Sequence, residues 1–111
     1  MPRDYKVYLE DILEAIGKIN RYTVGLSQEA FSGDERTLDA VVRNLEVIGE
    51  AIKKVPGKIR SKHPEVEWRR IAGLRDILIH EYFGIDMDII WDIVQNKLPV
   101  LEKQINQILS E

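Results

Sequence analysis

The most reactive side chains of this sequence lie between residues 75 and 82. Arg75, His80 and Tyr82 interrupt a run that is otherwise rich in Ile and Leu. A buried guanidinium without a partner is costly, so an Arg in such a run needs a specific interaction. Arg binds phosphate oxygens through its planar fork, and His can accept or donate a proton near neutral pH. These side chains are therefore suited to chemistry on a phosphate group.

The spacing of these residues makes a site on one regular helix awkward. Arg75 and His80 lie five positions apart, about 140° around an α-helix, whereas Asp76 and His80 share a face. Arg75 could still meet His80 if its long side chain bends back, if the turn before Gly84 is distorted, or if a dimer axis completes the site. Each residue also has an ordinary explanation: Arg75 at a core margin, His80 near a helix end, and Tyr82 in packing.

The elements that would position this stretch are helical along the whole chain. Apolar residues recur every three or four positions, and no segment alternates like a β-strand. The pattern predicts an all-α fold of four main helices with short extra ones, antiparallel because the connections are short. The apolar faces are Tyr5, Leu9, Ile12, Ile16 and Ile19; Leu38, Val41, Leu45, Ile48, Ile52 and Val55; Trp68, Ile71, Leu74 and Leu78; and Ile89, Ile93, Leu98, Leu101, Ile105 and Ile108.

Residues typical of helix ends separate the first segments. Gly25 is expected to end the first helix, and Ser27 to cap a short helical turn through Phe31. Ser32 and Glu35 have the spacing of a capping box. We therefore expect Ser32 to cap the second long helix.

Prolines mark the helix ends in the second half of the chain. Pro56 and Gly57 are expected to end the second long helix, and Pro64 to open the third, with Glu65 and Glu67 in its first turn. Asp86 is a good cap for the last helix. Pro99 is expected to kink or split that helix, because it lacks an N–H and its ring clashes with the preceding turn.

Composition limits the classes of protein. The 111 residues fit one domain, 1–111, and the chain has no Cys and two His, so we expect no disulfide, no metal site and no cofactor. The beginning of the chain lacks a signal-peptide pattern, and no apolar run is long enough to span a membrane. These features predict a cytoplasmic protein without a membrane partner.

The charges are segregated along the chain, although the net charge is only −3. A basic segment precedes the motif and an acidic tail follows it, which is equally compatible with two solvated faces and with a functional surface. Arg43, Glu46 and Glu50 also form either a solvated face or the wall of a site. The cations of the basic segment are Lys53, Lys54, Lys58, Arg60, Lys62, Arg69 and Arg70.

The helix around the motif carries more apolar surface than a monomer of this size needs. Its apolar side chains cover more than half of the helical circumference, which predicts burial on more than one side. Gly49, inside the second long helix, would also allow close approach of a neighbouring backbone. Both features predict a homodimer. The apolar residues are Leu74, Ile77, Leu78, Ile79, Tyr82 and Phe83.

The motif and its context resemble a known family. Arg-x4-His is similar to the signature of the HEPN superfamily (higher eukaryotes and prokaryotes nucleotide-binding domain), and Arg-x4-His-x-Tyr resembles its HepT toxin branch. The similarity extends over nearly the whole chain. It includes Arg43-Asn44-Leu45-Glu46-Val47-Ile48-Gly49-Glu50-Ala51, Trp68, Ile71-Ala72-Gly73-Leu74-Arg75, Trp91 and Leu98-Pro99.

The resemblance implies a HEPN-like helical homodimer with the motif at the interface, acting as a metal-independent RNase toxin. It also implies a minimal nucleotidyltransferase antitoxin as partner, which would transfer AMP from ATP to Tyr82. Asp76 stands where Asn is also common, so it either orients His80 or faces away.

The implied roles agree with the chemistry of the side chains. RNA cleavage by 2'-hydroxyl attack needs a proton acceptor or donor, which His80 can be, and a cation for the added negative charge, which Arg75 can be. The basic segment could guide the RNA backbone. The alternative is a non-catalytic HEPN module that regulates or presents substrate to a nucleotidyltransferase, with Arg75 and His80 only contacting nucleotide phosphates.

Overall fold

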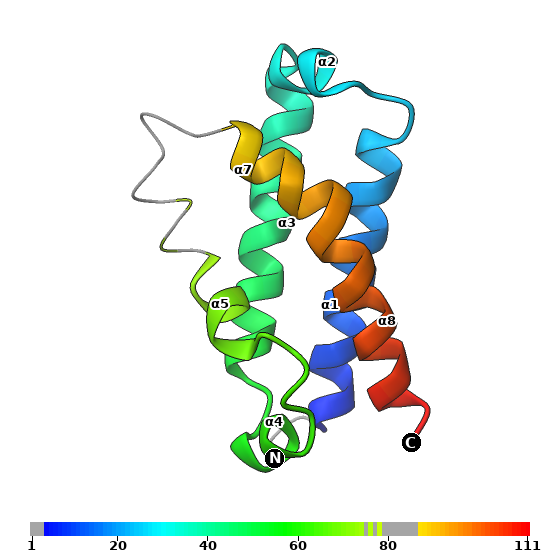
Figure 1. The fold of residues 1–111 in the computed structure, drawn as a ribbon, viewed down its shortest axis with the longest axis vertical. Coiled ribbons are helices and arrows are strands. Elements are labelled where there is room, and N and C mark those ends of the chain that lie inside the picture. Colours follow the sequence, from blue (N-terminus) through cyan, green and yellow to red (C-terminus); the bar gives the residue numbers. More distant parts are fainter. Residues whose placement is uncertain (1–3, 75, 77, 79–86) are drawn as a thin grey trace.

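The computed structural model describes residues 4–74, 76, 78 and 87–111. Within these ranges the regular elements are all helices. Two long helices, α1 (Tyr5–Thr23) and α3 (Glu35–Lys53), run antiparallel, and α8 (Leu98–Leu109) packs along α1 (Figure 1). The prediction of an all-α, HEPN-like fold is confirmed.

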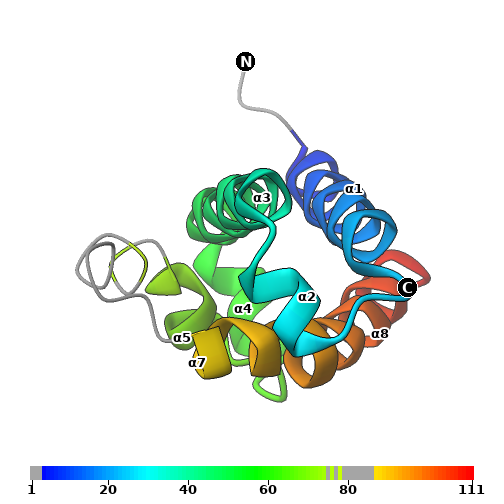
Figure 2. The ribbon, with the colours of Figure 1, turned by 90° about the horizontal axis from the view of Figure 1, so that it is seen from above.

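Short helices close the two ends of this bundle. α2 lies across one end (Figure 2), where its Phe31 is fully buried, and α4 lies at the opposite end. α5 packs against α3, and α7 against α2. The short helical elements are α2 (Gln28–Ser32), α4 (Gly57–Lys62), α5 (Trp68–Ala72), α7 (Met87–Asp92) and the π-helical turn η1 (Ile93–Lys97).

The predicted apolar faces of α1 and α3 form the centre of the core. Most of these side chains have no exposed surface, and burying each large aliphatic one contributes about 1.5–3 kcal/mol relative to leaving it in water. The stripe on α3 continues into Val55, which is buried after the helix has ended. The fully buried members are Leu9, Ile12, Ile16, Ile19, Val41, Leu45, Ile48 and Ile52.

The first two helix boundaries agree with the sequence prediction. Gly25 adopts φ +79°, a left-handed conformation that glycine tolerates better than other residues, directly after α1. The amide of Val24 still donates to the carbonyl of Asn20 at 2.9 Å. Ser27 caps α2, because its hydroxyl accepts from the amide of Ala30 at 3.1 Å.

The predicted cap of α3 is wrong. Ser32 is still part of α2, and Asp34 caps α3 instead, accepting from the amide of Thr37 at 3.1 Å and from its hydroxyl at 2.7 Å. A cap must directly precede the first helical residue, and here that residue is Glu35. The buried Phe31 holds Ser32 inside α2, so the capping-box spacing is not used.

The predicted start of the third helix is also wrong. Pro64 lies in a turn, and α5 begins only at Trp68, so Glu65 and Glu67 are not in its first turn. Val66 is buried, and its carbonyl accepts from the amide of Trp68 at 2.9 Å. Burial of Val66 and Trp68 therefore overrides the local helix-start signal.

The prediction that Pro99 interrupts the last helix is confirmed. The segment is divided into α7, η1 and α8, with Pro99 in the first turn of α8. The amide of Leu98 donates to the carbonyl of Ile93, five residues back, which is the π-helical pattern. The wider turn accommodates the missing N–H and the bulk of the proline ring.

The buried face of this last segment differs from the predicted one at its beginning. Ile90 and Val94 enter the core, whereas Ile89 is 46% exposed and Ile93 is only partly buried. The apolar run before η1 offers two adjacent faces, and packing of α7 against α2 selects one of them. From Leu98 onward the predicted face is confirmed.

Candidate active site and nucleic-acid interface

The chain enters the motif from α5 and leaves it into α7. Arg75, His80 and Tyr82 lie outside the described residues, as does the predicted cap Asp86. Leu74 and Leu78 are 7% and 4% exposed, so these two side chains are buried as predicted, and Asp76 between them is exposed. The predicted pairing of Asp76 with His80 also lies outside the described residues.

The entry into the motif is held by α5. Trp68 opens this helix with its ring buried, and its indole N–H donates to the carbonyl of His63 at 2.9 Å. Gly73 ends the helix, with its amide directed to the carbonyls of the preceding turn. α5 thus has one anchored end, five residues before Gly73.

The exit from the motif is held by α7. The ring of Trp91 lies 5.2 Å from that of Phe31, centroid to centroid, at an interplanar angle of 37°. Gln28 of α2 also donates to the carboxylate of Asp88. α2 therefore fixes α7 through one aromatic and one polar contact.

The cations of the basic segment are exposed, and they belong to the end of α3, to α4 and to α5, which lie near one another at one end of the molecule (Figure 1). Every predicted RNA-contacting cation of this segment is exposed, so each can meet a phosphate without a burial cost. We call this set the basic surface; it consists of Lys53, Lys54, Lys58, Arg60, Lys62, Arg69 and Arg70.

Some cations of the basic surface already have neighbours. Lys53 Nζ lies 3.6 Å from Glu50, and Arg70 lies 3.7 Å from Glu67, both within one helical turn. Exposed pairs of this kind contribute little free energy, so they are easily exchanged for phosphate contacts. Lys54 Nζ lies 5.7 Å from the ring centre of Tyr8, which keeps its charge at the mouth of a groove.

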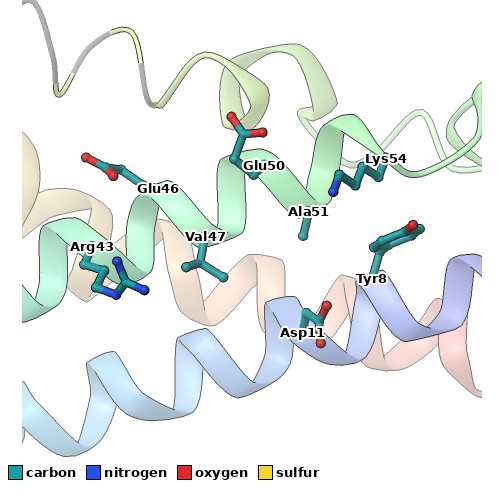
Figure 3. Close-up of a pocket in the computed structure, with 8 residues that line it drawn as sticks. All are labelled: Tyr8, Asp11, Arg43, Glu46, Val47, Glu50, Ala51 and Lys54. Atoms are coloured by element: carbon teal, nitrogen blue, oxygen red, sulfur yellow. The ribbon is translucent and has the colours of Figure 1, made fainter. Parts of the chain in front are cut away.

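A polar groove of about 310 Å³ runs between α1 and α3 (Figure 3). Arg43 turns toward α1 and Lys54 toward Tyr8, whereas Glu50 turns toward α5. Arg43, Glu46 and Glu50 thus line one wall of this groove, and their role in a functional site stays a prediction. The lining residues are Tyr8, Asp11, Arg43, Glu46, Val47, Glu50, Ala51 and Lys54.

A second and larger groove, of about 600 Å³, separates α5 from α7, η1 and α8. We call it the α5–α8 groove. It is mainly apolar, and Ile89 and Val100 are 46% and 55% exposed on its outer side. The residues that flank the motif, Leu74 and Asp88, belong to its lining, so the groove lies beside the two ends of the motif segment.

The rim of the α5–α8 groove carries both signs of charge. Arg70 and Lys97 are basic, whereas Glu67, Asp88 and Asp92 are acidic. Among the described residues, no cluster of His, Asp and Glu is arranged to hold a metal ion, and none of the described helices is long and apolar enough to cross a membrane.

Comparison with known proteins identifies the family. The family model described as ribonuclease HepT-like matches residues 12–108 of the chain. The chain belongs to the ribonuclease HepT-like family. The resemblance predicted from Arg75, His80 and Tyr82 and their context is therefore confirmed, and the family match covers the basic surface, the α5–α8 groove and the α3 wall of the polar groove.

Members of the HepT-like family from archaea and bacteria are similar over their full length. The probable ribonuclease HepT of Thermococcus cleftensis is 44% identical over 97% of this chain and 98% of its own. Two relatives bear the name Putative RNase. MJ0127 of Methanocaldococcus jannaschii is 46% identical over 100% of this chain and 93% of its own, and TTE0752 of Caldanaerobacter subterraneus subsp. tengcongensis is 46% identical over 94% and 93%.

No solved structure matches the chain. The structural features of this HepT-like protein that the sequence did not indicate are long-range ones. Tyr8 and Asp11 meet α3 across the polar groove, and His63 is nearly buried although its neighbours in the sequence are mostly polar. For Tyr8 and Asp11 the local signal in the sequence is their helical spacing, which fits an exposed surface helix equally well.

Proposed function

We propose that this protein is a metal-independent endoribonuclease that acts as the toxin of a toxin–antitoxin pair. The observation that carries the proposal is the family match over residues 12–108, which includes the whole Arg75–Tyr82 motif. The exposed basic surface supports it, since RNA binding needs accessible cations. We further propose a cytoplasmic reaction, where RNA and ATP are both present.

In the proposed reaction, the 2'-hydroxyl of one nucleotide attacks the adjacent phosphorus. A 2',3'-cyclic phosphate forms, the P–O5' bond breaks, and the next nucleotide leaves with a 5'-hydroxyl. His80 takes the proton from the 2'-hydroxyl or gives one to the leaving oxygen. Arg75 stabilises the added negative charge on the phosphorus centre. Asp76 is exposed, and its proposed role is the supporting one of orienting His80.

We propose that two copies of the chain form the working enzyme, with the α5–α8 groove as the contact. The groove lies beside both ends of the motif segment and exposes Ile89 and Val100. A two-fold contact places the same patch on both sides, so it must be complementary to itself. An apolar floor with both basic and acidic residues on its rim meets that condition. A dimer would supply a second Arg75 and His80, which relieves their separation on a single helix.

The proposed partner is a minimal nucleotidyltransferase that neutralises the toxin. It would transfer AMP from ATP to the Tyr82 oxygen, forming a phosphodiester and releasing pyrophosphate. The added group brings bulk and negative charge next to His80. Both effects oppose the approach of an RNA backbone.

The proposal predicts that His80→Ala and Arg75→Ala each abolish RNA cleavage. The loss follows because proton transfer and charge stabilisation each contribute about 100-fold or more. The measurement is cleavage of labelled RNA in excess EDTA, with circular dichroism to verify the fold of each variant. Tyr82→Phe is the matched control, because it removes only the modifiable oxygen and should cleave RNA like the wild type.

The same assay separates the alternative function, a non-catalytic module that regulates or presents substrate to a nucleotidyltransferase. Absence of RNA cleavage by the purified wild type, with AMP still added to Tyr82 by the partner, would favour that alternative. Intact-mass analysis with partner and ATP measures the modification. A mass increase that persists in Tyr82→Phe would contradict the assignment of Tyr82.

A further inference from the structure

His63 contacts its own turn and also a segment that lies far away in the sequence. Its side chain is only 11% exposed, and each ring nitrogen faces a carboxylate: Nδ1 lies 3.3 Å from Glu65 and Nε2 lies 3.2 Å from Glu111. Glu65 follows two residues later in the same turn, whereas Glu111 lies just beyond α8. The imidazole therefore joins the turn before α5 to the end of α8.

Two further hydrogen bonds extend this connection. Gln104 of α8 donates to the carbonyl of Glu65 at 3.0 Å, and the indole of Trp68 donates to the carbonyl of His63 at 2.9 Å. One polar unit thus links α8 to the first residue of α5. We call His63, Glu65, Gln104 and Glu111 the His63 clasp.

The clasp lies at one end of the α5–α8 groove. Glu65 and Gln104 both line that groove, one on each wall. α5 packs extensively on α3, whereas the groove separates it from α8. The distance between the two walls near this end is therefore controlled by the clasp.

We propose that His63 is a positioning residue for RNA cleavage, because its clasp sets the placement of α5 and thus of the segment that begins at Arg75. The inference rests on the proposed function for its catalytic readout. α5 ends at Ala72, only three residues before Arg75. A shift of about 1 Å at a reacting group can cost on the order of 100-fold in rate, even when its cause lies far away.

The composition of the clasp favours positioning over stability. Glu65 and Glu111 have side chains 50% and 60% exposed, so their contacts with the imidazole add little to folding. Val66 and Trp68 already supply apolar burial for the turn. The imidazole instead fixes the relative orientation of Glu65 and Glu111, since its two nitrogens hold these two partners at opposite edges of a rigid ring.

The test follows the placement of α5 and the cleavage rate in the same proteins. Trp91→Phe leaves Trp68 as the single tryptophan and keeps an aromatic ring against Phe31. In that background we compare His63→Leu, which removes both polar contacts, with His63→Gln, whose amide can still donate to Glu111. Readouts are Trp68 emission, single-turnover cleavage and unfolding by heat.

We expect His63→Leu to shift the Trp68 emission and to lower the maximal cleavage rate by about 10- to 100-fold, with little change in KM. His63→Gln should recover most of both. Glu102→Gln is the matched control. It also removes a carboxylate from α8, but Glu102 is not one of the described carboxylates that contact His63. It should leave emission and cleavage unchanged.

Thermal unfolding shows whether His63→Leu is folded. The proposal is overturned if the folded variant keeps both the Trp68 emission and the cleavage rate of the wild type. If His63→Leu does not fold, the test passes to the two exposed carboxylates of the clasp. Unchanged cleavage rates in Glu65→Ala and Glu111→Ala would also overturn the proposal. A wild type that fails to cleave RNA would instead refute the proposed function. The Trp68 emission of the same variants would then still show whether the clasp places α5, and unchanged emission would overturn that placement.

Discussion

At the residue scale, RNA binding depends on cations that are accessible without a conformational change. Lys58 and Arg60 belong to α4, which lies at one end of the molecule (Figure 1), and both are exposed. Lys18 and Arg21 carry the same charges on α1, in the part of that helix that is farther from α4. The comparison of these two pairs separates a specific basic surface from the general effect of net charge.

We predict that Lys58→Ala with Arg60→Ala weakens RNA binding, and that the dependence of affinity on salt becomes shallower. Each lost phosphate contact on single-stranded RNA reduces the slope of log K against log salt by about 0.7. The measurement is a fluorescence-anisotropy titration at several salt concentrations with inactive His80→Ala protein. Lys18→Ala with Arg21→Ala makes the same change in net charge, so an equal effect would contradict a localised RNA surface.

Asp34 is a second residue whose charge has a defined effect. The hydrogen bond from the hydroxyl of Thr37, and then that from its amide, hold the pKa of Asp34 below its ordinary value of 3.8. A lowered pKa in the folded state means that the carboxylate stabilises the fold above the unfolded value. That contribution is lost as the pH falls through the lowered pKa.

We therefore predict that Asp34→Ala lowers the unfolding temperature at pH 7, and that the difference from wild type shrinks in acid below pH 3.8. Asp34→Asn keeps an oxygen acceptor but loses the charge, so its unfolding temperature at pH 7 should lie between those of Asp34→Ala and the wild type. Thermal unfolding followed by circular dichroism measures both. A deficit in Asp34→Ala that stays constant into acid would show that the charged cap is not the cause.

At the element scale, one glycine inside α1 and one just beyond its end have opposite expected responses to a side chain. Gly25 ends the helix with φ +79° and has nothing within 4 Å of an added Cβ, so the cost of a side chain there is purely conformational. Gly17 lies inside the helix, and an added Cβ would approach only the end of the Arg21 side chain, at 3.8 Å. The backbone, rather than available space, distinguishes the two positions.

We predict that Gly25→Ala destabilises the protein by about 1–2 kcal/mol, the cost of a left-handed conformation for an L-residue. Gly17→Ala should stabilise it by about 1 kcal/mol, the difference in helix propensity. Urea unfolding of the two variants measures both changes. Stabilisation in both variants would mean that the chain after α1 can adopt another turn.

At the scale of the whole molecule, the exposed apolar side chains of the α5–α8 groove are the strongest sign of a missing partner surface. Large apolar patches on a soluble protein usually mark an interaction site, whereas single exposed residues do not. Ile89 and Val100 line the same groove, while Val24, which is 78% exposed, stands beside Gly25 at the end of α1. Exposure alone therefore does not identify the contact.

We predict that the wild type is a dimer at micromolar concentration, and that Ile89→Asp with Val100→Asp makes it a monomer with impaired RNA cleavage. Desolvating two carboxylates in an apolar contact is costly. Light scattering after size-exclusion chromatography measures the mass. Val24→Asp is the matched control and should remain dimeric; a monomeric wild type would contradict the dimer itself.

Much of the fold could be predicted because it depends on local periodicity. The apolar faces of α1 and α3, the end of α1 at Gly25 and the interruption at Pro99 all follow from residue types at fixed spacing. It could not be predicted that Asp34, and not Ser32, caps α3. Both residues are good caps, and the choice between them was made by burial of Phe31.

The features of the candidate site likewise divide into those that the sequence predicts and those that it does not. The sequence by itself predicted its chemistry, because Arg75, His80 and Tyr82 supply a cation, a group able to carry a proton and a phenolic oxygen, and their context indicated the family. Tertiary structure alone decided which charges are accessible, which face of residues 89–94 is buried, and that His63 joins α5 to α8. The physical reason is that periodicity constrains neighbours within a helix, whereas these features depend on contacts between segments far apart in the chain.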